Sequence, residues 1–249
     1  TYSVVDINVT LLQLANIIGK SLDSDTTMRS DLIFEHAKLY YEKLKQYEGA
    51  EKQLLTILNK EPENIGDVYL LLGKTYLRLA EKEENKENES ESYRRKANEN
   101  FKLAVSNIST CSNPDEASWL KIVSGLNSDS ITVSREKILI ESLIKNYPES
   151  YLLEDWDRTL AYALSFEEDY FDSAVSYFQK LINDFKQSDK YPSYLYSYAQ
   201  LIREKDSDNA LKIYKEIASE YPKSEVTAFA LSQVAEDYLT KSMFNESYI

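Results

Sequence analysis

The side chains with the greatest capacity for chemistry are few in this chain of 249 residues. His36 is the single histidine and Cys111 the single cysteine. Nucleophilic catalysis by a thiol or hydroxyl needs a base that converges on it, and a transition-metal site needs several His or Cys ligands. One histidine on a helix supplies neither arrangement, and we expect His36 to be a partly exposed helix residue. The sequence therefore predicts no catalytic, cofactor-binding or metal-binding residue.

Neighbouring carboxylates offer the other route to catalysis, because two of them can act as general acid and general base. Glu154 with Asp155, and the acidic run at 167–169, have this arrangement. With 42 Asp and Glu residues in the chain, such neighbours arise without function, and we interpret them as a charged surface. The five glycines are isolated, so the sequence has no phosphate-cradling loop. We predict that the protein is not an enzyme.

The composition favours long helices. Only 5 Gly and 5 Pro are present, although 43% of the residues are hydrophobic and 29% are charged. The net charge of −13 repels phosphate, so we expect no nucleic-acid partner. No run of 18 apolar residues occurs, and the sequence therefore predicts no membrane span.

A repeated tetrapeptide punctuates the chain. Tyr-Pro-x-Ser occurs at 147–150 and at 221–224, and a related Tyr-Pro-Ser occurs at 191–193. Proline disfavours a helix at the residue before it, and a serine two residues later can accept a bond from an N–H at the start of the next helix. The motif therefore predicts a helix end, a turn and a helix start, reused from unit to unit.

An alanine-headed stripe recurs between these breaks, in the pattern Ala-x3-Φ-x2-Φ, where Φ is apolar or aromatic. This spacing places the three residues on one helical face, with a small residue where a partner helix can approach closely. The stripe occurs in four segments: Ala50, Leu54 and Ile57; Ala97, Phe101 and Ala104; Ala174, Phe178 and Leu181; and Ala210, Tyr214 and Ile217.

A second helical pattern precedes two of these stripes. It reads Phe-x2-Ala-Lys-x2-Tyr at 34–41 and Tyr-x2-Leu-Gly-x2-Tyr at 69–76. Together the two patterns resemble the tetratricopeptide repeat family, with Lys38 as a departure at the small-residue position. The resemblance implies an all-α, tetratricopeptide-like α-solenoid of about five helical hairpins. One helix at about 3–22 and another at about 224–241 are expected to flank the hairpins.

The predicted organisation has two continuous parts. Residues 1–109 contain the N-terminal helix and two repeat-like hairpins, with an acidic insertion at 81–92 that we interpret as a solvated extension of two helix ends. Residues 110–249 contain degenerate hairpins. The chain ends on apolar residues without an evident cap, and we expect the native protein to continue beyond Ile249.

An interaction scaffold that presents a helical groove to a protein or peptide partner is the leading hypothesis for function. The chain contains 20 tyrosines, and tyrosine is enriched at interfaces. Four of them are candidate partner-binding residues: Tyr151, Tyr162, Tyr194 and Tyr196. Packing in the core or in a groove wall explains each of the four equally well.

The Tyr-Pro punctuation over about 145–241 is similar to that of bacterial envelope proteins. One is the repeat lipoprotein of the outer-membrane barrel-assembly machinery, and another is the periplasmic coordinator associated with the Tol–Pal system. This resemblance implies a periplasmic adaptor that supports outer-membrane integrity, assembly or cell division, with a lipid anchor or a further domain outside this sequence.

Two alternatives remain open. The first is a cytoplasmic repeat adaptor, or co-chaperone, that grips acidic tails. Such adaptors place Lys and Asn on the inner face of their first helices, where this chain has Glu35 and Leu39. The second is a glycan-binding helical-repeat protein that uses tyrosines and Trp156 as stacking platforms.

Overall fold

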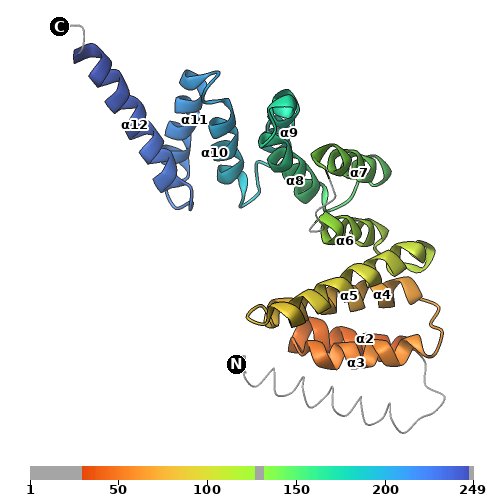
Figure 1. Ribbon diagram of the computed structural model, residues 1–249. Helices are drawn as coiled ribbons and strands as arrows, with labels where there is room; N and C mark the ends of the chain where they lie inside the picture. The colour runs from red at the N-terminus through yellow and green to blue at the C-terminus, as the bar shows by residue number, and fades with distance from the viewer. Residues whose placement is uncertain (1–29, 127–131, 247–249) are drawn as a thin grey trace. The chain divides into compact units, whose positions relative to one another are not determined.

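The computed structural model describes residues 30–126 and 132–246, and within these ranges the chain forms helices and turns without strands (Figure 1). The chain divides into two compact units, before and after the junction of residues 131 and 132. The boundary predicted at 109/110 separates the repeat-like hairpins from the degenerate ones, and it stays a prediction. The helix predicted at 3–22 lies outside the described residues, as do residues 127–131.

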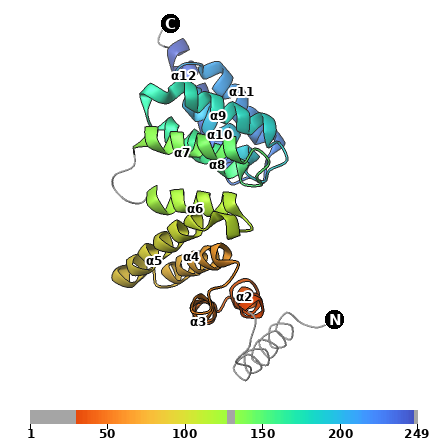
Figure 2. The same cartoon turned by 90° about the vertical axis from the view of Figure 1, so that its right-hand side faces the viewer.

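The first unit is a stack of antiparallel helices in chain order. Each helix packs on the next one, and the longest contact joins α4 to α5 (Figure 2). The elements are α2 (Ser30–Lys38), the π-helical segment η1 (Leu39–Leu44), α3 (Tyr47–Leu58), α4 (Ile65–Lys82), α5 (Glu87–Ser106), the short 3₁₀ segment η2 (Ile108–Thr110) and α6 (Pro114–Leu126).

The second unit repeats this construction. Its helices also pack on their neighbours in chain order, and its last helix, α12, packs on α11. The elements are α7 (Val133–Asn146), α8 (Leu153–Ser165), the 3₁₀ segment η3 (Glu168–Tyr170), α9 (Phe171–Asp184), α10 (Tyr191–Ile202), α11 (Ser207–Glu220) and α12 (Thr227–Glu246). The all-α fold of stacked hairpins predicted from the sequence is therefore confirmed.

The alanine-headed stripes form the cores of both units. All twelve stripe residues are buried, and ten of them have no exposed surface, because each stripe faces the preceding helix of its hairpin. Gly73 shows why a small residue is needed opposite a stripe. A Cβ atom at Gly73 would lie 2.5 Å from the ring of Phe101, so only hydrogen leaves room for α5 to approach α4 this closely.

The Tyr-Pro motifs end and restart helices as predicted, with a short turn between. α7 and α11 end one residue before Tyr147 and Tyr221, whose N–H groups close the last helical turns. Ser150 accepts a 3.1 Å bond from the N–H of Leu152, and the next helices begin three residues after the serine. The related motif at 191–193 differs, because Pro192 lies in the first turn of α10, where a proline needs no N–H partner.

The acidic run at 81–92 belongs to the adjoining ends of α4 and α5. Residues 83–86 form the turn, and Lys86 pairs with Glu83 at 2.7 Å and with Glu89 at 3.2 Å. Inside the hairpin, the hydroxyl of Ser90 donates a 2.9 Å bond to the carbonyl oxygen of Ala80. The acidic run therefore lengthens the α4–α5 hairpin, and the buried bond between Ser90 and Ala80 links the two helices there.

Candidate functional site

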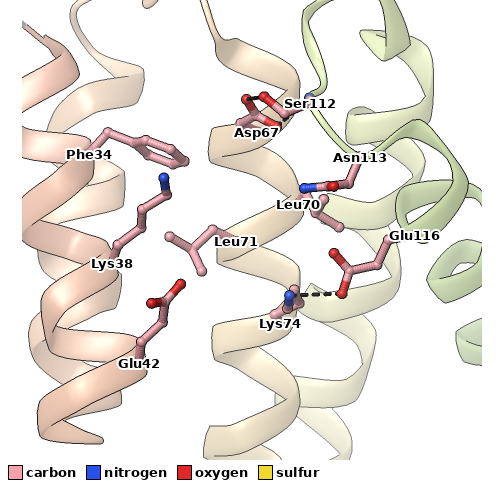
Figure 3. Close-up of a pocket in the computed structure, with 10 residues that line it drawn as sticks. All are labelled: Phe34, Lys38, Glu42, Asp67, Leu70, Leu71, Lys74, Ser112, Asn113 and Glu116. Carbon is pink, nitrogen blue, oxygen red and sulfur yellow. Dashed lines mark hydrogen bonds and ion pairs between the residues drawn. The ribbon is translucent and has the colours of Figure 1, made fainter. Parts of the chain in front are cut away.

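A groove crosses one face of the first unit, between α2, α4 and α6 (Figure 3). Its cavity volume is about 120 Å³. The lining residues come from alternate helices of the stack, so the groove runs across the helix hairpins. They are Phe34, Lys38 and Glu42; Asp67, Leu70, Leu71 and Lys74; and Ser112, Asn113 and Glu116.

Helical spacing brings these residues to one surface. Phe34, Lys38 and Glu42 follow one another at intervals of four residues along α2 and η1, and so share a face. On α4, Asp67 and Lys74 are seven residues apart, which is about two helical turns. The third wall is the N-terminal turn of α6 and the two residues before it.

The floor of the groove is apolar. Phe34, Leu70 and Leu71 are 6%, 4% and 8% exposed, so each is packed in the core and shows only a small part of its side chain to the groove. Such a surface offers contact to an apolar side chain but no hydrogen-bonding group. Recognition of polar atoms therefore depends on the rim.

Two polar contacts hold α6 against α4 at the rim. The Lys74 Nζ and Glu116 Oε1 atoms are 2.8 Å apart in a partly buried ion pair. Asp67 accepts two 2.7 Å bonds, one from the backbone N–H and one from the hydroxyl of Ser112 (Figure 3). These contacts fix the width of the groove between α4 and α6.

The remaining cation also has an acidic neighbour. Lys38 Nζ lies 2.9 Å from Glu35 Oε1 and 5.0 Å from the centre of the Phe34 ring. Both lysines of the groove are thus balanced by carboxylates. The groove has no net positive field with which to attract an acidic ligand.

Two polar side chains of the groove are uncommitted. Within residues 30–126, neither the Glu42 carboxylate nor the Asn113 side-chain amide takes part in a hydrogen bond or ion pair. A carboxylate accepts hydrogen bonds, and an amide both donates and accepts them. Together they can serve the N–H and C=O groups of a peptide backbone lying in the groove.

The candidate catalytic chemistry finds no support in the arrangement. His36 is 2% exposed, which shows that the expectation of a partly exposed histidine is wrong. It lies in α2, and its ring centre is 4.8 Å from that of Tyr40 in η1. Burial raises the pKa of the Cys111 thiol to about 11, so this thiol stays protonated at neutral pH. No cluster of three or more His, Cys, Asp or Glu side chains suited to a metal occurs in the described ranges.

The neighbouring carboxylates of α8 are engaged in structural contacts. Glu154 accepts hydrogen bonds from the hydroxyls of Tyr194 and Ser188. Asp155 pairs with Arg158 at 2.8 Å and with Lys190 at 3.2 Å. Each carboxylate thus ties α8 to α10 or to the loop before it.

The four candidate tyrosines lie in three different environments of the second unit. Tyr151 is 70% exposed just before α8, whereas Tyr194 is 1% exposed in the core. The ring of Tyr194 is therefore unavailable to a partner, because it fills the space between α8, α9 and α10. Tyr162 and Tyr196 are half-buried, and partner binding by Tyr151, Tyr162 and Tyr196 stays a prediction.

Tyr162 and Tyr196 belong to a row of contacts across α8, α10 and α12. The Tyr162 hydroxyl lies 2.8 Å from the hydroxyl of Ser197, and the Tyr196 ring centre is 6.3 Å from that of Phe229, which is 60% exposed. This row in the second unit is made by alternate helices, as is the groove of the first unit.

Sequence reasoning missed that groove, because its rim residues look like ordinary charged positions of a helix surface. The four-residue spacing of Phe34, Lys38 and Glu42 is the signal that could have revealed it.

No helix of the described residues is both long enough and apolar enough to cross a membrane. A search of curated proteins finds no match.

Family models and solved structures do show similarity. A tetratricopeptide repeat model matches residues 194–224, which cover most of α10, all of α11 and the turn after it. The structure of YrrB, described as a TPR protein with an unusual peptide-binding site, is similar with a TM-score of 0.58 and 13% identity, over 88% of this chain and 99% of that chain. The assembly chaperone of RpL4, Acl4, is similar with a TM-score of 0.54 and 12% identity, over 96% of this chain and 98% of that chain. These likenesses establish the fold of this protein, an all-α solenoid of the tetratricopeptide-repeat type.

Proposed function

We propose that the protein is an interaction scaffold that holds a peptide segment of a protein partner in the groove of the first unit. The observation that carries this proposal is the groove itself: an apolar floor on α2 and α4, with two uncommitted polar side chains at its rim. Repeat proteins commonly use surfaces of this kind to bind extended partners.

The size of the cavity favours a peptide over a small molecule. Small-molecule and cofactor sites usually measure about 300–1,000 Å³. The groove cavity of about 120 Å³ is well below this range and is suited to one apolar side chain. The rest of the ligand would then lie along the open rim, where Glu42 and Asn113 can bond to its backbone.

The charges of the groove indicate which peptide it prefers. Lys38 and Lys74 are each paired with a glutamate, and Glu42 is a free acceptor at the rim. We infer that the ligand is a peptide with an apolar anchor and a neutral or basic neighbour, in agreement with the protein's net charge of −13. An acidic tail, as gripped by a co-chaperone, is disfavoured by the same charges.

The similar fold of YrrB supports the proposal, since that protein is described as having a peptide-binding site. The glycan-binding alternative loses its main residue, because Trp156 is fully buried and cannot stack on a sugar. A place in the bacterial envelope, with a role in outer-membrane integrity, assembly or cell division, is our proposal from the Tyr-Pro punctuation. The full-length gene tests it: a leader sequence supports an envelope adaptor, and a leaderless start removes that assignment.

Selection of displayed peptides tests the groove. A phage library of random 12-residue peptides is selected against the 249-residue chain, and the enriched clones are measured against variants. Asn113→Trp covers the groove from an exposed position, and Glu42→Lys reverses the free charge. We expect each variant to bind the clones at least about tenfold more weakly, a loss of 1.4 kcal/mol.

Lys102→Trp is the matched control, because Lys102 is exposed on α5 and lies outside the groove. It should bind the selected clones like the unchanged protein. Equal binding by all four proteins, or no enriched clone, would contradict the proposed function.

A further inference from the structure

The second unit has a cavity where two of its Tyr-Pro dipeptides meet. One dipeptide, Tyr191-Pro192, begins α10, and the other, Tyr221-Pro222, follows the end of α11. The ring centres of the two tyrosines are 5.8 Å apart, and both prolines line the same cavity. The two turns that carry the dipeptides lie at one edge of the stack, where α10 begins and α11 ends (Figure 1). We call this cavity the Tyr-Pro pocket.

Helix punctuation explains only part of this arrangement. Pro222 prevents α11 from continuing, and Pro192 is tolerated in the first turn of α10. Neither role requires the two dipeptides to share a cavity. The volume of the Tyr-Pro pocket is about 410 Å³, more than three times that of the groove cavity in the first unit.

The Tyr-Pro pocket is open to the surface. Five of its ten lining residues are exposed, and they include Pro222 and all four charged residues of the lining. Its volume lies within the usual range of about 300–1,000 Å³ for small-molecule sites, but such sites bury most of the ligand. The open wall instead suits a short segment of a longer ligand.

The lining also limits how such a segment is held. The backbone N–H groups of Ser188, Tyr191, Tyr221 and Ser224 donate to carbonyl oxygens nearby in the chain, and the two prolines have no N–H group. An added β-strand needs a free N–H at every second residue, and the lining provides no such row. Side-chain donors remain: the hydroxyls of Tyr191, Tyr221 and Ser224 take part in no hydrogen bond within residues 132–246.

We propose that the Tyr-Pro pocket binds a proline-rich segment of a partner protein in the polyproline II conformation, with a basic residue beside the prolines. A polyproline II helix has no internal hydrogen bonds, so its carbonyl oxygens can accept bonds from the free hydroxyls. Its proline rings pack on aromatic rings. The segment is already ordered before it binds, so an open surface can hold it at a low cost in entropy.

The charges around the pocket favour the basic residue. Segments 184–190 and 220–225 carry four carboxylates that form no ion pair within residues 132–246 and only two lysines of that kind, since Lys190 pairs with Asp155 at 3.2 Å. The carboxylates are those of Asp184, Asp189, Glu220 and Glu225, and the lysines are Lys186 and Lys223. This excess of negative charge, together with the net charge of −13, attracts a basic ligand.

The 249 residues themselves contain no such ligand. The five prolines are at least 30 residues apart, so neither this chain nor a second copy of it offers a proline-rich segment. Neighbouring turns of the stack also leave the pocket open. Ser188 and Lys190 bond to Glu154 and Asp155 at the start of α8, yet no residue of the turn before α8 lines the pocket. The site is distinct from the groove of the first unit and does not depend on the proposed function.

A synthetic peptide is the probe. A labelled peptide of two arginines followed by eight prolines is titrated with the 249-residue chain, and binding is followed by fluorescence anisotropy. We expect saturable binding. A peptide in which alternating glycine and serine replace the prolines should bind at least about tenfold more weakly. A peptide in which two glutamates replace the arginines should also bind more weakly, because it meets the excess of carboxylates.

A matched pair of tyrosine variants locates the site. Tyr221→Leu keeps an apolar side chain but removes the aromatic ring and the hydroxyl, and we expect it to bind the arginine–proline peptide at least about tenfold more weakly. Tyr147→Leu is the control. Tyr147 has the same position after α7 that Tyr221 has after α11, is also half-buried and lies outside the pocket. It should leave binding unchanged.

A second pair uses exposed positions only, so folding is preserved. Asp189→Lys reverses a charge of the lining and should weaken binding at least about threefold. Glu204→Lys makes the same change of net charge in the turn between α10 and α11, outside the pocket, and should leave binding unchanged. Asn113→Trp, which covers the groove of the first unit, should also bind the peptide like the unchanged protein.

Several results would overturn the proposal. They are equal binding of the glycine–serine peptide, equal effects of the two variants in either pair, and loss of binding in Asn113→Trp. Absence of saturation at millimolar peptide would overturn it as well. Binding of a neutral oligosaccharide such as maltohexaose, without binding of the proline peptide, would assign the pocket to glycans instead.

Discussion

The hydroxyl of Tyr194 donates a 2.6 Å hydrogen bond to Oε1 of Glu154, which lies 40 residues earlier in the chain. Glu154 is in the first turn of α8 and Tyr194 in the first turn of α10, so the bond joins the starts of two successive hairpins. Tyr194 is a candidate partner-binding residue by its type, but in the structure its buried side chain links two hairpins of the solenoid.

Tyr194→Phe removes this bond and keeps the ring. We expect the free energy of unfolding to fall by about 1–2 kcal/mol, because the acceptor is a carboxylate that is partly withdrawn from water. Unfolding in urea measures the loss. Tyr196→Phe is the control. The Tyr196 hydroxyl accepts a 3.0 Å bond from the side-chain amide of Gln200 on the same helix, at an exposed site, so this variant should change stability by less than about 0.5 kcal/mol. Equal losses in the two variants would contradict the role assigned to Tyr194.

The buried Asp157 can be replaced together with its partner. Its side chain is 0% exposed and pairs with Lys180 at 2.8 Å. Asp157 comes three residues before Leu160, and at the same place in the repeat α4 has Tyr69, three residues before Leu72, and α10 has Leu195, three residues before Tyr198. We expect Lys180→Met alone to cost about 2–3 kcal/mol, because it leaves a buried charge without a partner. The double variant Asp157→Leu with Lys180→Met should be at least as stable as the unchanged protein, which thermal unfolding will show.

The sign of the pH dependence provides an independent check. Burial is the main reason that the pKa of Asp157 is raised, and Lys180 opposes this rise. A carboxyl whose folded pKa lies above its unfolded value favours the folded state at low pH and loses that contribution as pH rises. Lys180→Met should therefore be closest to the unchanged protein near pH 4 and furthest from it near pH 7. A difference in stability between the two proteins that is largest near pH 4 would contradict a raised pKa for Asp157.

Gly73→Ala tests the close approach of α4 and α5. Alanine is the better helix former by about 1 kcal/mol, but its Cβ would meet the fully buried Phe101 ring at 2.5 Å. We expect a net loss of about 1–2 kcal/mol of stability. In the Phe101→Leu background the same substitution should cost less, and a double-mutant cycle by urea unfolding measures the difference. Equal costs in both backgrounds would exclude the steric explanation.

Tyr214 should limit stability at high pH. Burial raises its pKa to about 12 from the usual 10, so the unfolded state ionises first, and stability is lost as pH rises from about 10 through 12. Its buried hydroxyl has no hydrogen-bond partner among the described residues. Tyr214→Phe should therefore raise stability at neutral pH by about 1 kcal/mol and reduce the alkaline loss. Alkaline titrations followed by phenolate absorbance and circular dichroism measure both effects.

Much of the fold could be predicted because helices that pack on one another carry apolar residues at helical spacing in the sequence. Stripes such as Ala210, Tyr214 and Ile217 had to be buried, since three residues at helical spacing can face only one neighbour. The helix ends at Tyr147 and Tyr221 could be predicted equally well, because proline restricts the backbone of its immediate neighbours. The groove could not be predicted in this way, since its residues come from three walls, and residues of different walls are at least 25 residues apart in the sequence.

The sequence by itself determined the all-α class, the hairpin units and the positions of their turns, because local spacing and backbone chemistry decide these. Only the tertiary structure decided that Tyr194 is buried while Tyr151 is exposed, and that Glu42 and Asn113 border one groove. It also decided that Leu231 of α12 is exposed whereas Leu195 of α10 is buried. The physical reason is that a side chain's exposure depends on whichever helix lies opposite, and a residue's own neighbours in the sequence do not record which helix that is.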